Sequence, residues 1–149
     1  MIESTDGPAR AREVVASLIK AGLIEDADAR AAELRAVPIA SPQGSAAGWF
    51  VGLVMGDRLI GFAQLEEDLR FRRYSSFRGH EPAATDWLDA STVIDRAREW
   101  LEPEHDLRPP HLGYDVNPDR LAWVVTAIGP DGTEHRLLVA GNEVFERPG

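Results

Sequence analysis

Residues 121–146 read LAWVVTAIGPDGTEHRLLVAGNEVFE, and this stretch decides the fold. Two apolar runs of strand length flank Pro130-Asp131-Gly132, in which proline fixes φ and glycine supplies a positive φ, as a tight turn requires. A further run of strand type, residues 143–146, follows directly. Consecutive strands joined by short turns pair antiparallel with their neighbours, so this half of the chain predicts an antiparallel sheet.

An earlier stretch has the same design. Residues 48–65 read GWFVGLVMGDRLIGFAQL and are divided by a turn at Gly56-Asp57. A strand through residues 34–39 is expected before this hairpin, and a strand over residues 69–74 after it. The first half of the chain therefore predicts a second antiparallel sheet.

An amphipathic helix is expected ahead of each sheet. The first covers residues 8–21, with Pro8 in its first turn and Gly22 as the stop signal. The second starts near Ser91-Thr92, where either hydroxyl serves as the N-cap, and ends before Pro103. Both helices carry apolar residues at helical spacing, so each is expected to cover one face of its sheet.

These elements predict an α+β fold of two repeated helix-plus-antiparallel-sheet units, residues 1–79 and 80–149, within one compact domain. The stretch between them, residues 78–87, has glycine, proline and charge without periodicity and is expected to be a linker. An edge-type strand is expected over residues 112–116. Most of the tryptophans are core candidates by position, whereas Trp87 lies in the linker and is expected to cover a gap between the halves. The first and last of the four are expected on equivalent strands: Trp49, Trp87, Trp100 and Trp123.

The second half resembles a PepSY-type module. The features that match are a helix with spaced alanine and apolar residues, an aromatic strand with Trp123, an Asp-Gly hairpin, an apolar strand and a terminal EVFE strand. The first half is similar to it through residues 48–65 and the trailing LRFRRYSSF at 69–77. The resemblance implies two tandem units of cystatin-like α+β shape, in a family whose members bind or restrain other proteins, often outside the cytoplasm.

The composition limits the class of protein. The chain has 149 residues, 44% hydrophobic content and no cysteine, which excludes a disulfide framework, a thiolate metal site and a cysteine nucleophile. No apolar run approaches the roughly 18 residues that a membrane-spanning helix needs. The start, MIESTDGPARARE, is polar and has no apolar region of the kind found in signal peptides. We therefore expect a cytoplasmic protein that contacts no membrane.

The net charge of −9 is unevenly distributed. Residues 1–78 hold 11 acidic and 10 basic side chains, whereas residues 79–149 hold 14 acidic and 6 basic ones. Phosphate binding relies on clustered lysine and arginine, so the acidic whole argues against nucleic acid as a partner. The acidic half serves solubility or faces a basic protein partner.

The sequence contains no motif for catalysis or for metal binding. No pair of histidines has the i, i+4 spacing of a helical metal site, and His105 and His111 are expected to lie in a solvated loop. No serine stands in a GxSxG elbow, and the glycines form neither GxGxxG nor GxxxxGK[ST]. We therefore expect no catalytic residue, no cofactor and no metal site, and predict that the protein is not an enzyme.

Arginines alternate with aromatic residues in the segment RFRRYSSFR, residues 70–78. Arginine forks onto carboxylates while aromatic rings supply contact area, so this composition is typical of binding surfaces. The alternative is a structural strand with Phe71 turned into the core and arginines in water. The candidate interaction surface consists of Arg70, Arg72, Arg73 and Tyr74.

Two functions are compatible with these observations. The first is a non-enzymatic protein- or peptide-binding or regulatory module, which the duplicated pattern and the interaction surface favour. The second is a small-ligand-binding protein or weak enzyme with a pocket between helix and sheet, where folds of this type can hold a ligand. A titratable side chain buried in such a pocket would favour the second function.

Overall fold

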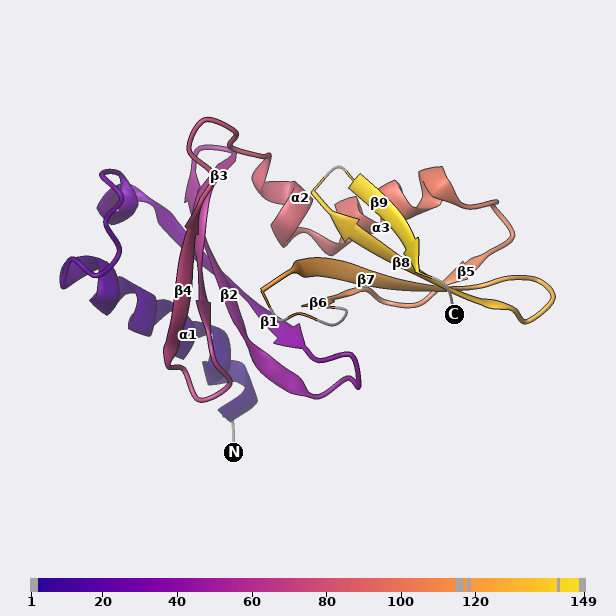
Figure 1. Cartoon of the computed structure of the whole chain (residues 1–149), viewed down its shortest axis with the longest axis horizontal. Helices are drawn as coiled ribbons and strands as arrows, with labels where there is room; N and C mark the ends of the chain where they lie inside the picture. Colours follow the sequence, from indigo (N-terminus) through magenta and orange to yellow (C-terminus); the bar gives the residue numbers. More distant parts are fainter. Residues whose placement is uncertain (1–2, 115–116, 118, 142, 148–149) are drawn as a thin grey trace. The chain divides into compact units, whose positions relative to one another are not determined.

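Figure 1 shows a computed structural model of the chain, which describes residues 3–114, 117, 119–141 and 143–147. These residues form three α-helices, a short 3-10 helix and nine strands, and the sheet is mixed. The α+β class is therefore confirmed. The chain divides into two compact units, one made of Met1–Ile39 with Ala46–Ala84 and the other of Ala40–Ser45 with Thr85–Gly149.

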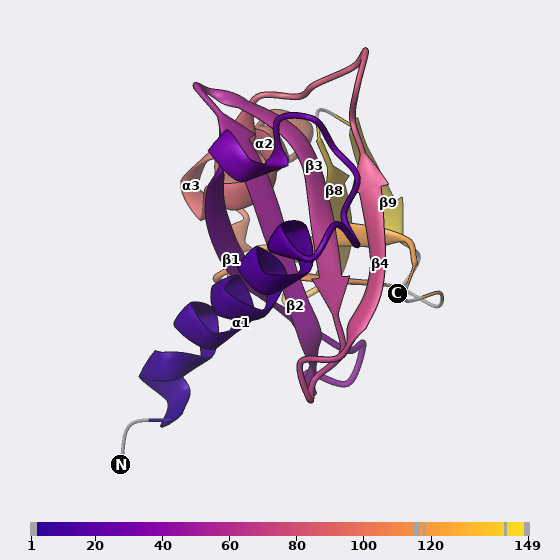
Figure 2. The ribbon, with the colours of Figure 1, turned by 90° about the vertical axis from the view of Figure 1, so that its left-hand side faces the viewer.

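The first unit contains a long helix that lies across one face of its strands, as Figure 2 shows. The strand order is β4-β3-β2-β1, so β4 is a terminal strand. The pairs β2/β3 and β3/β4 are antiparallel. The elements are α1 (Glu3–Lys20), η1 (Ala29–Ala31), β1 (Glu33–Ala40), β2 (Ala46–Met55), β3 (Arg58–Leu65) and β4 (Phe71–Ser76).

The core of the first unit lies between α1 and the sheet. Ala11, Val15 and Ile19 recur every four residues on α1, so they share one face of the helix, and all three are buried. They pack in one cluster with apolar residues of the strands, namely Val51, Leu53, Ile60, Ala63 and Leu65. Burial of a valine, leucine or isoleucine side chain stabilises a fold by about 1.5–3 kcal/mol, so this contact fixes α1 on the sheet.

Both ends of α1 have a local explanation. The helix stops as expected, because the amides of Gly22 and Leu23 turn back to the carbonyls of Ile19 and Leu18, at 3.1 and 2.9 Å. It starts five residues earlier than predicted, and Pro8 lies inside it. The ring of Trp49 packs closely on Gly7, so that a Cβ at this position would lie 2.8 Å from the ring. We attribute the helical conformation of residues 7 and 8 to this tertiary contact.

The second unit has two consecutive helices and five strands. Its strand order is β6-β7-β8-β9, with β5 beside β7, and each of the pairs along this order is antiparallel. Helix α3 contacts β7, β8 and β9, and buries Val93 and Ala97. The elements are α2 (Ala84–Leu88), α3 (Ala90–Trp100), β5 (Asp106–Leu107), β6 (His111–Tyr114), β7 (Leu121–Ile128), β8 (Glu134–Ala140) and β9 (Glu143–Arg147).

Three expectations for this unit need correction. The N-cap of α3 is Asp89, whose carboxylate accepts from the amide of Ser91 at 3.0 Å, because a charged acceptor suits the positive end of a helix. The predicted linker ends within α2, because residues 84–87 belong to that helix. Trp100 is the last residue of α3 and is 54% exposed, so the buried stripe stops at Ala97. Val116, the end of the predicted edge strand, lies outside the described residues.

Trp123, one of the two tryptophans expected on equivalent strands, is buried on β7. Its indole N–H donates to the carbonyl of Trp87 at 3.0 Å. Trp49 lies half-buried on β2. The boundary between the compact units falls at residues 84 and 85, and residues 40–45 belong to the second unit. That the two units are repeats of one another stays a prediction.

Candidate functional site

The predicted interaction segment begins with an outward-facing aromatic side chain. Phe71 is 39% exposed, so the expectation that it points into the core is wrong. Leu69 occupies a turn with φ 75° and packs against the core instead. The register between β3 and β4 then shifts, since Leu65 pairs with Phe71 but Gln64 pairs with Arg73. The extra residue breaks the alternation on which the expectation rested.

Arg70 and Arg72 flank this ring and are exposed. Arg70 Nε lies 2.8 Å from Asp68 Oδ2, and Arg72 Nη1 lies 3.0 Å from Glu66 Oε2. Both carboxylates come from the turn before β4. Ion pairs at this level of exposure contribute about 0–1 kcal/mol and weaken with salt, so another carboxylate can replace these partners at little cost.

The other two residues of the predicted interaction surface, Arg73 and Tyr74, point to opposite faces of the sheet. Arg73 donates to Gln64 Oε1 at 2.9 Å, and its guanidinium carbon lies 5.0 Å from the ring centroid of Phe62. Tyr74 is packed against the core cluster on the α1 side. Adjacent strand residues point to opposite faces. The structure therefore leaves Arg70, Phe71 and Arg72 exposed at the start of β4, whereas Arg73 and Tyr74 bind partners within the fold.

Tyr74 and Arg78 meet at a buried carboxylate that sequence reasoning missed. The side chain of Asp26 is 4% exposed and accepts from the Tyr74 hydroxyl at 3.0 Å, from the amide of Asp28 at 3.1 Å and from the guanidinium of Arg78. Arg78 also binds Asp28 Oδ2 at 2.6 Å. We call these four residues the Asp26 network. Its members are separated by up to 52 residues, so no spacing in the sequence announces it.

The electrostatics of the Asp26 network favour a permanent charge on the carboxylate. Arg78 holds the pKa of Asp26 below its usual range, and the hydrogen bonds from Asp28 and Tyr74 act in the same direction against burial. Burial, and then the Asp26 carboxylate, raise the pKa of the Tyr74 phenol. The phenol therefore stays protonated and donates. Gly61 makes room for it, because a Cβ at that position would lie 2.2 Å from the Tyr74 oxygen.

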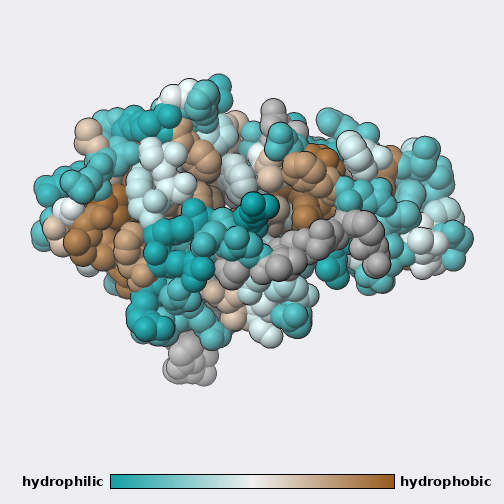
Figure 3. Space-filling view, viewed as in Figure 1, coloured by the Kyte–Doolittle hydropathy of each residue, from teal (hydrophilic) through white to brown (hydrophobic). Residues whose placement is uncertain are grey.

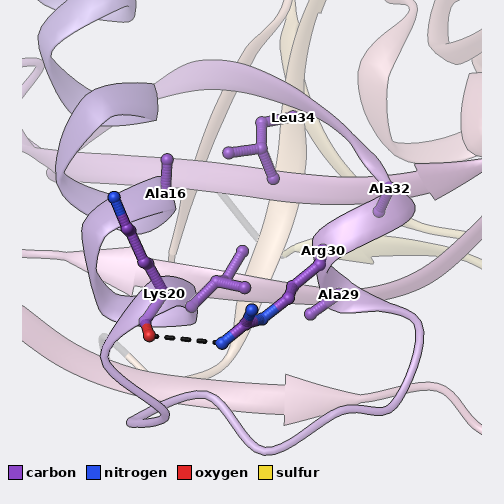
Figure 4. A pocket seen from close by; sticks show the side chains of 7 residues that line it. Ala16, Lys20, Ala29, Arg30, Ala32 and Leu34 are labelled. Carbon is purple, nitrogen blue, oxygen red and sulfur yellow. Dashed lines mark hydrogen bonds between the residues drawn. The ribbon is translucent and has the colours of Figure 1, made fainter.

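An open pocket lies between α1, η1 and β1, with a volume of about 380 Å³. Figure 4 shows its lining side chains, with Arg30 reaching from η1 toward the last turn of α1. Arg30 Nη2 donates to the main-chain carbonyl of Lys20 over 3.4 Å. The lining is otherwise apolar, and the full set is Ala16, Ile19, Lys20, Ala29, Arg30, Ala32 and Leu34. The position matches the pocket between helix and sheet that the alternative function requires.

Two residues of the Asp26 network lie just before the part of the chain that lines this pocket. Asp26 and Asp28 immediately precede η1, whose residues Ala29 and Arg30 form one wall. Tyr74 and Arg78 hold these carboxylates from β4 and the residues after it. The network therefore fixes the segment that carries η1, and with it one wall of the pocket.

The histidines are distributed over separate local contacts. His105 Nδ1 lies 3.1 Å from the Glu102 carbonyl oxygen, and His135 Nδ1 lies 2.9 Å from Glu146 Oε2. Burial, and then the nearby Arg136, lower the pKa of His111. Among the residues that the structure describes, no three His, Asp or Glu side chains are grouped so that they could hold a metal ion.

None of the helices in the described ranges combines the length and the apolar character needed to cross a membrane.

Comparisons of this chain with protein-family models, with curated proteins and with solved structures give no match.

Proposed function

We propose that this chain is a non-enzymatic binding or regulatory module that engages an acidic protein or peptide segment. The contact is made by Arg70, Phe71 and Arg72, which we call the β4 surface. The observation that carries the proposal is the exposed ring of Phe71, which begins a terminal strand and has an exposed arginine on each side of it in the sequence. The β4 surface differs from the four residues predicted from the sequence. It omits Arg73 and Tyr74, because these side chains bind Gln64 and Asp26 within the fold.

The chemistry of the β4 surface suits this partner. An aromatic ring supplies contact area at a low entropic cost, and arginine binds carboxylates in a planar, bidentate manner. The present partners, Asp68 and Glu66, are partly exposed and hold the arginines weakly. Since the chain carries a net charge of −9, a basic surface of this kind is distinct from most of the molecule. Binding is expected to weaken as salt rises.

The other terminal strand provides a matched control. Phe145 on β9 is 52% exposed, and glutamates stand two residues before it and one residue after it, at 143 and 146. The two strands therefore each present an exposed phenylalanine, with arginines close to it in the sequence on β4 and glutamates close to it on β9. An acidic partner should select Phe71 and avoid Phe145, because like charges across an interface are unfavourable.

The test uses a synthetic peptide of about ten alternating Glu and Val residues, a length that spans one strand. It is titrated into ¹⁵N-labelled protein, with a Lys/Val peptide beside it. We expect shifts of the β4 amides with the acidic peptide only, loss of affinity of at least about tenfold in R70Q/R72Q and in Phe71→Ala, and no loss in Phe145→Ala. Equal binding of both peptides, or an unchanged affinity of R70Q/R72Q, would overturn the proposal.

We also propose that the two units are PepSY-like repeats. What supports this is that each unit has a run of four strands that are neighbours in the sheet and come after a helix in the chain, β1 to β4 after α1 and β6 to β9 after α3, with the two-residue β5 added between α3 and β6. Trp49 and Trp123 each lie on the second strand of their series. Experimentally determined structures of the two units should superpose with these tryptophans matched, and a mismatch by one strand would exclude duplication.

The second candidate function, small-ligand binding, is favoured by one specific observation, the pocket between α1, η1 and β1. The two functions use different surfaces of the first unit. They are therefore compatible and can be tested separately.

A further inference from the structure

We propose that the pocket between α1, η1 and β1 binds a single-chain amphiphile, with an apolar tail inside and a carboxylate head at Lys20 and Arg30. This inference rests on the second candidate function and names the class of ligand that the pocket would take. It does not depend on the β4 surface.

The lining of the pocket suits an unbranched apolar tail. Three alanines, Ala16, Ala29 and Ala32, line it and leave space that larger side chains would fill, while Ile19 and Leu34 supply apolar walls. A volume of about 380 Å³ lies at the small end of the range for ligand pockets, which runs from roughly 300 to 1,000 Å³. One chain of medium length fits this space better than a two-chain lipid. Figure 3 shows apolar surface over the C-terminal half of α1.

The charged side chains of the pocket are both cations. Neither Lys20 nor Arg30 takes part in an ion pair within the described part of the chain. Arg30 has a single long hydrogen bond, 3.4 Å to the carbonyl of Lys20. That carbonyl belongs to the C-terminal end of α1, which carries roughly half a negative charge. Two full positive charges outweigh it, so an anionic head is attracted to the pocket.

The wall that carries Arg30 is fixed before a ligand arrives. Asp26 and Asp28, just ahead of η1, are held by Tyr74 and Arg78. A wall that is already ordered loses little further entropy on binding, which favours affinity in a small pocket. The site therefore combines an apolar cavity, two unpaired cations and a braced wall.

The experiment titrates monomeric octanoate, decanoate and decanol into ¹⁵N-labelled full chain, followed by amide shifts. We expect saturable binding of decanoate with shifts confined to the pocket lining, and roughly fourfold tighter binding per methylene from octanoate to decanoate. Decanol should bind at least about fivefold more weakly, because it lacks the charge. K20Q and R30Q should each weaken decanoate and leave decanol unchanged, whereas Arg12→Gln, an exposed cation on the same helix, should change neither.

A filling variant keeps the proposal testable independently of charge. Ala16 is exposed on α1 and tolerates leucine in a helix, so Ala16→Leu should stay folded and lose decanoate binding. Ala90→Leu, at an exposed position of α3, serves as the matched control. Unchanged binding by Ala16→Leu, or equal affinity for decanol and decanoate, would overturn the proposal. The peptide titration above is unaffected by any of these outcomes.

Discussion

Replacement of Asp26 by asparagine tests the Asp26 network directly. The amide keeps the size of the carboxylate but removes its charge, and it offers an N–H₂ group where an acceptor is required. The side chain is 4% exposed and accepts three hydrogen bonds, two of them from Tyr74 and Arg78. Hydrogen bonds to charged groups contribute about 1.5–3 kcal/mol, against about 1 kcal/mol for neutral ones.

The expected loss follows from this difference. Three bonds that each lose part of their charge assistance would cost about 3 kcal/mol. The estimate is reduced because the Arg78 side chain is 42% exposed and regains water, and because it keeps Asp28 as a partner. We therefore expect D26N to lower the free energy of unfolding by about 2 kcal/mol at neutral pH. D28N, whose carboxylate is 48% exposed, should cost at most about 1 kcal/mol as a surface pair.

The pH dependence of the stability difference between wild type and D26N gives a second test of whether Asp26 acts as a buried charge. The folded-state pKa of Asp26 is lowered, and its value in an unfolded chain is about 3.9. The unfolded state therefore binds more protons, and the stability from this group is present above about pH 4 and is lost as the pH falls through the folded-state pKa. The difference between wild type and D26N should be constant from about pH 7 to 5 and shrink below about pH 4.

Urea unfolding followed through the amide resonances of β2 and β3 measures this unit selectively. D26N, D28N and wild type are compared at neutral and at acid pH. If D26N costs no more than D28N, or if its cost persists in acid, Asp26 does not stabilise the fold as a buried charge, and the explanation of the braced pocket wall fails with it.

Two further predictions concern packing near β4. Phe71→Ala should cost no more than about 1 kcal/mol in a urea unfolding experiment, because the ring is 39% exposed, whereas Phe50→Ala, at 0% exposure and stacked on Phe62, should cost about 3–5 kcal/mol. Gly61→Ala should cost about 1–3 kcal/mol, since its Cβ would lie 2.2 Å from the Tyr74 oxygen and 2.8 Å from the carbonyl of Ser75. Stability within about 0.5 kcal/mol of wild type in Gly61→Ala would show that Tyr74 can leave Asp26 freely.

The strands were predictable because their determinants are local. Alternation of apolar residues and turns of the Asp-Gly type act over a few residues, so the hairpins around residues 56 and 131 follow from the sequence. The strands observed there, β2 with β3 and β7 with β8, agree with the expected ranges to within three residues. The α+β class follows from the same signals, since each series of strands has a helix ahead of it.

The orientation of Phe71 was not predictable by the same reasoning. Alternation predicts the face to which a side chain points only while the pairing of β3 with β4 is regular. Arg72 is an extra residue in β4, so the residues before it no longer alternate in step with the residues after it. The cap of α3 shows a comparable competition. Ser91, Thr92 and Asp89 are all capping residues, and α3 begins at Ala90 with Asp89 as its cap. Composition alone does not choose among these three residues.

The candidate sites required the structure for a different reason. Asp26 is 48 residues from Tyr74 and 52 from Arg78, so the Asp26 network exists only after β4 has paired with β3. The pocket likewise depends on three segments, α1, η1 and β1. The residues that line it, mostly alanines, carry no chemical signal in the sequence, because small side chains matter here for the space that they leave.

The segment 70–78 explains why its composition suggested one surface while the structure divides it. Before the register shift, Arg70 and Phe71 are exposed and their charge partners are local and weak. After it, Tyr74 and Arg78 bind a carboxylate that is nearly excluded from water, where each hydrogen bond is stronger and harder to exchange. The same residue types therefore have exchangeable partners in one part of the segment and stabilise the fold in the other. The exposure of the carboxylate, more than that of the arginine, decides which role applies.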